Sequence, residues 1–241
     1  MSASPISHAA KVAALVLGVT AVAACSDSSG PSGPHGTVRF INAAPQVAQA
    51  DLHVGTTNSA DNIGFGRTTQ FSVSASGTAQ VFTAYPGTGT TSLGTQSVTV
   101  ANGKSYTLVL AQSTTASATT ELLYFPDTVS APSSGKAKLR VVNTSPSVAS
   151  FDVYVLNVGS TTTDLTAATP LSTASVQYKT AFPYTEVTSG AHRIVLTTAG
   201  TKNIVSDVAT FTFTAGKGYT FLTLDKAGGG APVSTISWSE R

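Results

Sequence analysis

The feature that most constrains this chain is an internal repeat. Residues 38–54 align without gaps with residues 139–155, and seven of the 17 positions are identical. The identical pairs are Arg39 with Arg140, Asn42 with Asn143, Pro45 with Pro146, Val47 with Val148, Ala48 with Ala149, Asp51 with Asp152 and Val54 with Val155. A second block pairs residues 103–107 with residues 216–220. Each copy spans about 90–105 residues, the usual size of one domain, so the repeat predicts two similar domains.

Within each copy, apolar and hydroxyl side chains alternate with a period of two. Val98 and Val100 alternate with Ser and Thr, and Phe211 and Phe213 alternate with Thr. Ser and Thr make up 68 of the 241 residues, and only 10% are charged, which favours short strands over long amphipathic helices. We predict an all-β protein with two tandem immunoglobulin-like antiparallel β-sandwich domains. The dipeptide Asn102–Gly103, between two alternating runs, also predicts a hairpin.

The N-terminal residues are typical of an export signal. Lys11 precedes a largely apolar run over residues 12–24. At about 1.5 Å per residue this run is too short for the ~30 Å core of a membrane. The last three residues of the run and the residue after it, 22–25, read Val-Ala-Ala-Cys. This tetrad resembles the bacterial lipobox, whose cysteine receives the lipid. We predict a lipoprotein signal peptide over residues 1–24, with lipidated Cys25 and a flexible tether over residues 25–36. The alternative is an ordinary secretory signal.

The repeat and the turn-forming residues set the remaining boundaries. We expect the first β-sandwich over residues 37–127, a linker over 128–136 and the second β-sandwich over 137–241. The offset between the copies rises from 101 to 113, so the second copy carries an insertion of 12 residues within 156–175. This segment is either a binding loop or a tolerated, disordered excursion. In either case, we expect its shortening to leave the melting temperature nearly unchanged.

The repeated motifs resemble a known family. Residues 140–155 read Arg-Val-Val-Asn-Thr-Ser-Pro-Ser-Val-Ala-Ser-Phe-Asp-Val-Tyr-Val, and residues 215–220 read Ala-Gly-Lys-Gly-Tyr-Thr. This pattern is similar to the bacterial domain of unknown function 4397. The first copy departs from it at several positions, including His53 in place of Tyr. The resemblance covers residues 37–241. It implies all-β domains, often in tandem in exported envelope proteins, and it supplies no catalytic residues.

Charge and residue types argue against several functions. The net charge of +2 is small and dispersed, whereas nucleic-acid binding requires clustered Lys and Arg. With one Cys and isolated Asp residues, we predict no metal and no cofactor. Asp51 and His53 could serve a Ser nucleophile, but the second copy has Asp152 with Tyr154 at these positions. His192 has no acidic partner nearby in the sequence. We therefore predict that the protein is not an enzyme.

The repeated charged residues are interpreted as scaffold. Arg39 and Asp51 each alternate with apolar neighbours, and the same holds for Arg140 and Asp152 in the second copy. The strands that carry them are separated by a Pro-containing turn. We therefore predict the structural ion pairs Arg39–Asp51 and Arg140–Asp152.

Together these observations predict a lipid-anchored protein of the bacterial cell envelope, on its periplasmic or cell-surface side, with a non-catalytic structural or interaction role. Its expected partners are the membrane, through the lipid on Cys25, and an envelope protein or a glycan. The alternative is a glycan- or polymer-binding envelope module, and the two are distinguished by whether aromatic side chains gather on one exposed face. The candidates are Tyr85, Tyr124, Phe125, Phe182, Tyr184 and Trp238. Otherwise these residues belong to the cores and strand edges.

Overall fold

A computed structural model describes residues 33–113 and 119–240 of the chain. The predicted signal peptide, Cys25 and most of the tether lie outside these residues. Residues 31–241 form one compact unit. No helix in the described part of the chain has the length and apolar character needed to cross a membrane.

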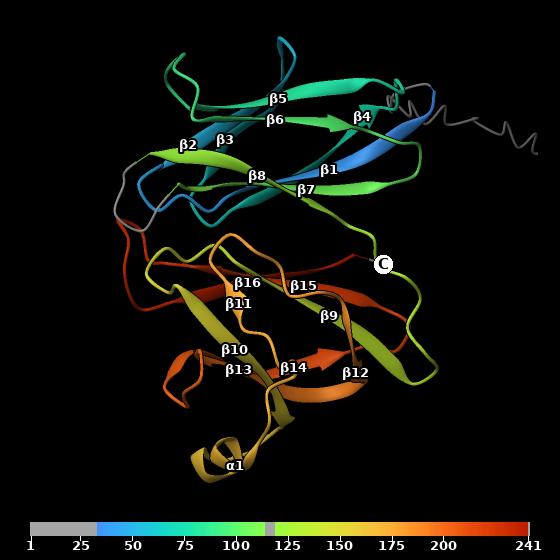
Figure 1. Cartoon of the computed structure of the whole chain (residues 1–241). Helices are drawn as coiled ribbons and strands as arrows, with labels where there is room; N and C mark the ends of the chain where they lie inside the picture. The colour runs from blue at the N-terminus through green and yellow to red at the C-terminus, as the bar shows by residue number, and fades with distance from the viewer. Residues whose placement is uncertain (1–32, 114–118, 241) are drawn as a thin grey trace, which may run out of the picture. The chain divides into compact units, whose positions relative to one another are not determined.

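The first sandwich consists of two four-stranded sheets. Sheet A has the strand order β4-β1-β7-β8, and sheet B has the order β3-β2-β5-β6 (Figure 1). The strands are β1 (His35–Asn42), β2 (Gln49–Val54), β3 (Thr57–Gly64), β4 (Thr68–Ser74), β5 (Ala79–Pro86), β6 (Gly94–Thr99), β7 (Ser105–Gln112) and β8 (Thr120–Pro126). The connection between β6 and β7 passes from sheet B to sheet A.

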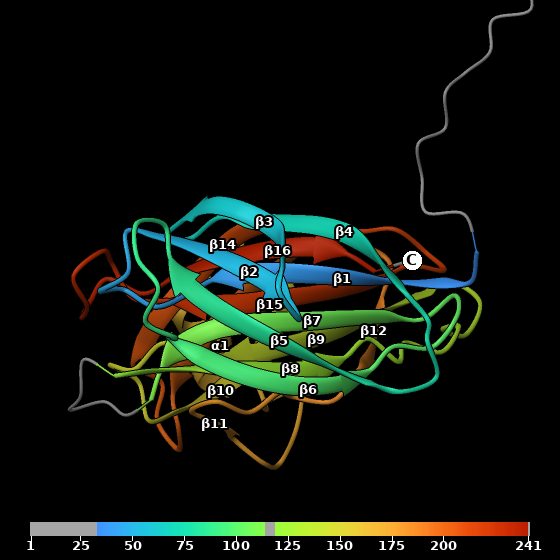
Figure 2. The ribbon, with the colours of Figure 1, turned by 90° about the horizontal axis from the view of Figure 1, so that it is seen from above.

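The second sandwich repeats this topology. Sheet C has the order β12-β9-β15-β16, and sheet D has the order β11-β10-β13-β14 (Figure 1). Figure 2 views the strands of both sandwiches from above. The elements are β9 (Lys136–Asn143), β10 (Ser150–Asn157), α1 (Thr162–Ala167), β11 (Val176–Gln177), β12 (Thr185–Thr188), β13 (Gly190–Thr198), β14 (Ile204–Phe213), β15 (Gly218–Leu224) and β16 (Ser234–Ser239). The predicted all-β fold of two sandwiches is confirmed. One pair in each sandwich is parallel, namely β1 with β7 and β9 with β15.

The predicted hairpin at Asn102–Gly103 is wrong. A turn does form there, and Gly103 has the positive φ of +67° that the dipeptide favours. The flanking strands β6 and β7 do not pair with each other, because they belong to the two different sheets of the sandwich. The dipeptide thus predicts the local backbone conformation but not the partner of each strand.

The repeated asparagines hold the turn that leaves the first strand of each sandwich. Asn42 is fully buried, and its Nδ2 donates to the carbonyl oxygen of Val47 at 2.9 Å. Its Oδ1 accepts the backbone N–H of Ala44 at 3.3 Å. Asn143 makes the equivalent bonds in the second sandwich. Buried backbone groups need such partners, so these identities between the copies reflect the scaffold.

Three apolar clusters lie between the four sheets and show how the sheets stack on one another. One cluster lies between sheets A and B and includes Phe40, and an equivalent cluster lies between sheets C and D. A third cluster joins sheet A to sheet C, and its buried members are Ile41, Ala43, Val109, Phe125, Val142, Leu222 and Leu224. Adjacent residues of β1, Phe40 and Ile41, thus serve different clusters, as strand alternation requires. Sheets A and C are therefore covered on both faces, and they join the two sandwiches.

The insertion in the second copy packs onto sheet D. Helix α1 begins with a capping box, in which the Thr161 side chain and Asp164 bond each other's backbone N–H. Leu165 of α1 is fully buried against Tyr154 and Val195 on the outer face of the sheet. The interpretation of this segment as a disordered excursion is therefore wrong. The segment covers apolar side chains of sheet D. The expectation that it can be shortened without changing the melting temperature assumed a loop that packs against nothing, and that assumption is contradicted.

We predict that Leu165→Ala lowers the free energy of unfolding by about 2–3 kcal/mol, because a buried leucine leaves a cavity when it is truncated. The matched control is Thr163→Ala, an exposed position in the same helix, which should change stability by less than about 0.5 kcal/mol. Urea unfolding of the two variants provides the measurement. Equal stability of both variants and the wild type would show that α1 does not cover sheet D.

Candidate functional site

The four residues of the predicted ion pairs have other partners in the structure. Asp51 accepts the backbone N–H of Asn62 at 2.7 Å, and Asp152 accepts the hydroxyl of Ser175 at 2.6 Å. Neither predicted pair is among the ion pairs of the described residues. In each sandwich the Arg strand and the Asp strand belong to opposite sheets. Both side chains do point away from the core, but from opposite faces of the sandwich.

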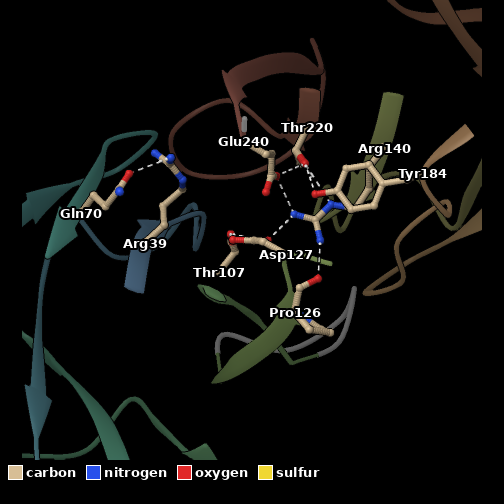
Figure 3. A network of polar contacts seen from close by, with 9 residues as sticks. All are labelled: Arg39, Gln70, Thr107, Pro126, Asp127, Arg140, Tyr184, Thr220 and Glu240. Carbon is tan, nitrogen blue, oxygen red and sulfur yellow. Dashed lines mark hydrogen bonds and ion pairs between the residues drawn. The ribbon is translucent and has the colours of Figure 1, made fainter. Parts of the chain in front are cut away.

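Arg140 is instead the centre of a buried polar network between the sandwiches (Figure 3). Its Nη2 lies 2.6 Å from Oδ1 of Asp127 and 2.8 Å from Oε1 of Glu240. Its Nε donates to the hydroxyl of Thr220 at 2.9 Å. The side chains of Arg140, Asp127 and Glu240 are only 4%, 5% and 2% exposed. One buried cation therefore contacts two buried carboxylates.

The two carboxylates occupy equivalent positions in the two sandwiches. Asp127 directly follows β8, and Glu240 directly follows β16, at the offset of 113. The hydroxyl of Thr107 donates to both carboxylate oxygens of Asp127 at 3.1 and 3.0 Å. The hydroxyl of Thr220 donates to Oε1 of Glu240. Each sandwich thus supplies one Thr–carboxylate pair, and Arg140 contacts both carboxylates.

Arg39, the equivalent of Arg140, makes different contacts. Its Nη2 donates to Oε1 of Gln70 at 2.9 Å, and its guanidinium carbon lies 4.9 Å from the ring centroid of Trp238. Arg140 is similarly placed over the ring of Tyr184, at 4.7 Å. Burial lowers the pKa of Arg39, although Glu240 and Asp127 oppose this shift. Arg39 therefore contributes a cation–π contact to the interface, whereas Arg140 contributes the ion pairs.

The surroundings of Asp127 disfavour its charged form. The pKa of Asp127 is raised to about 6, because burial and the charge of Glu240 raise it by more than Arg140 and the Thr107 hydrogen bond lower it. A cavity of about 80 Å³ borders the network and is lined in part by Arg39, Asp127 and Glu240. This volume suits a few water molecules, whereas a wider, open hollow of about 700 Å³ also reaches Asp127 and Glu240. The buried ion pairs themselves are suited to joining the sandwiches.

The two histidines considered for catalysis lie on different sandwiches. His53 is on the outward side of β2 and packs edge-on against Tyr85, with ring centroids 4.8 Å apart. His192 is on β13 and lies 5.8 Å from Phe213. The described residues contain no group of three or more His, Cys, Asp or Glu side chains placed to hold a metal ion.

The aromatic candidates do not gather on one exposed face. Phe125 and Trp238 belong to the cluster between the sandwiches, and Phe182 is buried in the second core. Tyr124 stacks with Tyr106 against the first core. Tyr184 contacts Arg140, as described above. Tyr85 alone among these candidates is on the outer face of sheet B.

Sequence reasoning missed the network residues Asp127, Glu240, Thr107 and Thr220. Their equivalence could have been found, because the offset of 113 that aligns the second block also relates Thr107 to Thr220 and Asp127 to Glu240. The shared contact of both carboxylates with Arg140 could not have been found, because an alignment of two copies does not show which sheets face each other.

Comparison with known proteins identifies a family for part of the chain. Residues 36–154 match the family described as "Domain of unknown function (DUF4397)", a span that includes the first sandwich and the first strands of the second. No curated protein sequence matches the chain.

Two solved structures illustrate the distant likenesses. One is a candidate polysaccharide-binding protein (DUF1812) from Bacteroides thetaiotaomicron, with 12% identity and a TM-score of 0.24, covering 86% of this chain and 98% of that one. The other is a family 26 carbohydrate-binding module from Eubacterium rectale in complex with maltoheptaose. It shows 8% identity and a TM-score of 0.22, covering 85% of this chain and 96% of that one. At these TM-scores, neither likeness supports a conclusion about this protein.

We predict that Arg140→Ala lowers the free energy of unfolding by about 3–5 kcal/mol, because it leaves two buried carboxylates without their cation. The matched control is Arg39→Ala at the equivalent position, which loses a cation–π contact and a hydrogen bond and should cost about 1 kcal/mol. Urea unfolding at neutral pH compares the two. Equal losses of stability in the two variants would contradict the conclusion that Arg140 is the centre of the network.

The raised pKa of Asp127 predicts a specific pH dependence. Its folded-state value of about 6 lies above the ordinary value of 3.8, so the proton is bound more tightly in the folded state. The group's contribution to stability is therefore fully present below about pH 4 and is lost as the pH rises through about 6. Asp127→Asn should remove this contribution, so wild type minus variant stability should decrease between pH 4 and 6.5. A difference that is constant over this range, in urea unfolding at several pH values, would refute the assignment.

Proposed function

We propose that the protein is a non-catalytic component of the bacterial cell envelope that presents two β-sandwiches as one rigid body from a lipid anchor. The observation that carries this proposal is the buried contact of Arg140 with Asp127 and Glu240. A joint that opened would expose these three charges together with the apolar cluster between sheets A and C. A fixed arrangement of two binding or spacing units suits a structural or interaction role.

A second set of contacts between the sandwiches supports the rigid body. The backbone N–H of Gly228 donates to the carbonyl of Pro45 at 2.8 Å, and Nε2 of Gln46 donates to the carbonyl of Gly228 at 2.8 Å. Asp225, only 2% exposed, holds this loop by accepting the N–H of Gly230 at 2.8 Å. The loop after β15 therefore binds the turn after β1, in addition to the Arg140 network.

The anchor is inferred from the sequence that precedes β1. Cys25 is followed by nine residues, all of them Ser, Gly, Pro or Asp, before strand β1 begins at His35. Such a segment spans roughly 15–18 Å when it behaves as a flexible chain. Each buried methylene of an acyl chain contributes about 0.8 kcal/mol, so two or three chains on Cys25 would give stable attachment. The proposed lipid would thus keep the sandwiches close to the membrane.

We predict that Cys25→Ala moves the protein from the membrane fraction to the soluble fraction and abolishes labelling by a radioactive or alkynyl fatty acid. Ser26→Ala, the adjacent substitution, is the control and should leave both unchanged. Fractionation after a high-salt wash, followed by blotting, provides the measurement. A Cys25→Ala protein that still sediments with membranes would rule out the lipid anchor.

A further inference from the structure

The two sandwiches differ in what covers their outer sheets. On sheet D, the inserted segment with α1 covers Tyr154, which is 2% exposed and packs with Leu165. Lys202 closes this cover, with Nζ 4.2 Å from the ring centroid of Tyr154 and 2.6 Å from the carbonyl oxygen of Ala168. The first copy has no counterpart of the insertion, because β2 and β3 are joined by a short turn at Gly55. The outer face of sheet B is therefore open.

The outward residues of sheet B differ from the equivalent residues of the covered sheet D. Strand pairing places His53 opposite Thr83, whereas the second sandwich has Tyr154 opposite Val195 at the same positions. The apolar pair under the cover is thus replaced by the half-buried imidazole of His53 and by Thr83, which is only 8% exposed. One step along the same side of β5, Tyr85 is half-buried and contacts the His53 ring. The open face therefore offers an aromatic pair among hydrogen-bonding groups.

We propose that this face, formed by β2, β3, β5 and β6, binds a neutral oligosaccharide chain. The rings of Tyr85 and His53 would contact the C–H face of a sugar. The Oδ1 atom of Asp51 accepts the N–H of Asn62, and its Oδ2 has no partner among the described residues, so it can accept a sugar hydroxyl. The amide of Asn58, opposite His53 on β3, adds a further polar group. The proposal rests on the interaction role proposed above and names its ligand.

The charge and polarity of the face favour this ligand over others. The outward side chains of the three strands are Gln49, Asp51 and His53 on β2, Ala79, Val81, Thr83 and Tyr85 on β5, and Thr95, Ser97 and Thr99 on β6. One carboxylate and no cation stand among them, and Asp61 on β3, which accepts from the amide of Asn58, adds a second carboxylate. These negative charges disfavour an anionic polymer. Val81, 51% exposed, is the one large aliphatic side chain of this set. A protein partner would need a larger apolar centre.

The test is titration of the mature full chain, in detergent micelles, with neutral hexasaccharides, namely β-1,4-linked glucose, xylose and mannose and α-1,4-linked glucose. The reporters are the ring resonances of ¹³C-labelled histidines, with His192 on the second sandwich as the internal control. We expect at least one sugar to shift His53 and not His192. Tyr85→Ala should weaken binding about tenfold, while Tyr85→Phe keeps it within about threefold. Asp51→Asn, which retains the acceptor for Asn62, should weaken it by a smaller factor.

Several results would overturn the proposal. These are the absence of any His53 shift with all four sugars, equal shifts of His53 and His192, or equally strong binding of an oligogalacturonate. Capture of an envelope protein that depends on Tyr85, without a sugar-induced shift, would also replace the glycan by a protein ligand. Each outcome is independent of the anchor, because the Cys25→Ala fractionation reports membrane attachment whether or not a sugar binds.

Discussion

The arrangement of the whole described chain depends on the sharing of one guanidinium by two buried carboxylates. Removing Arg140, Asp127 and Glu240 from water carries a large desolvation cost, which is offset only where geometry and further hydrogen bonds are good. The structure supplies these through Thr107 and Thr220. Because the partners come from both sandwiches, the network forms only when sheets A and C face each other. The apolar cluster beside it excludes water, and the polar contacts fix the register.

This constraint determines which surfaces remain for function. Sheets A and C are used on both faces, so among the four sheets of the described residues the outer faces of sheets B and D are those that no other sheet covers. In the second sandwich that face is covered by the insertion, which buries Leu165 on Tyr154. The same sequence difference that lengthens one copy therefore leaves the other copy with the open face. The equivalent residues of the two copies thus form the joint between the sandwiches, and the insertion in the second copy makes their outer faces differ.

The sequence predicts the fold well because period-two alternation and turn residues are local signals. Phe40 and Ile41 show the limit of these local signals. Alternation along the strand places the two side chains on opposite faces of the sheet, but it does not reveal that Ile41 faces a second sandwich. The predicted Arg39–Asp51 pair failed for the same reason, because the two strands are neighbours in sequence but lie in opposite sheets. Asp127 and Glu240 were overlooked because each directly follows the last strand of its copy, outside the two aligned motif blocks. Long-range sheet packing was the missing information.

The central claim is that the two sandwiches form one rigid body, and a distance distribution tests it most directly. Ser97 and Thr210 are both exposed and lie on different sandwiches. Spin labels can be attached through the substitutions Ser97→Cys and Thr210→Cys in a Cys25→Ala background, and the distance between them can be measured by double electron–electron resonance. The account predicts a single narrow distribution that broadens when Arg140 is also replaced by Ala. A broad distribution with Arg140 intact would show that the sandwiches move independently and would contradict the account.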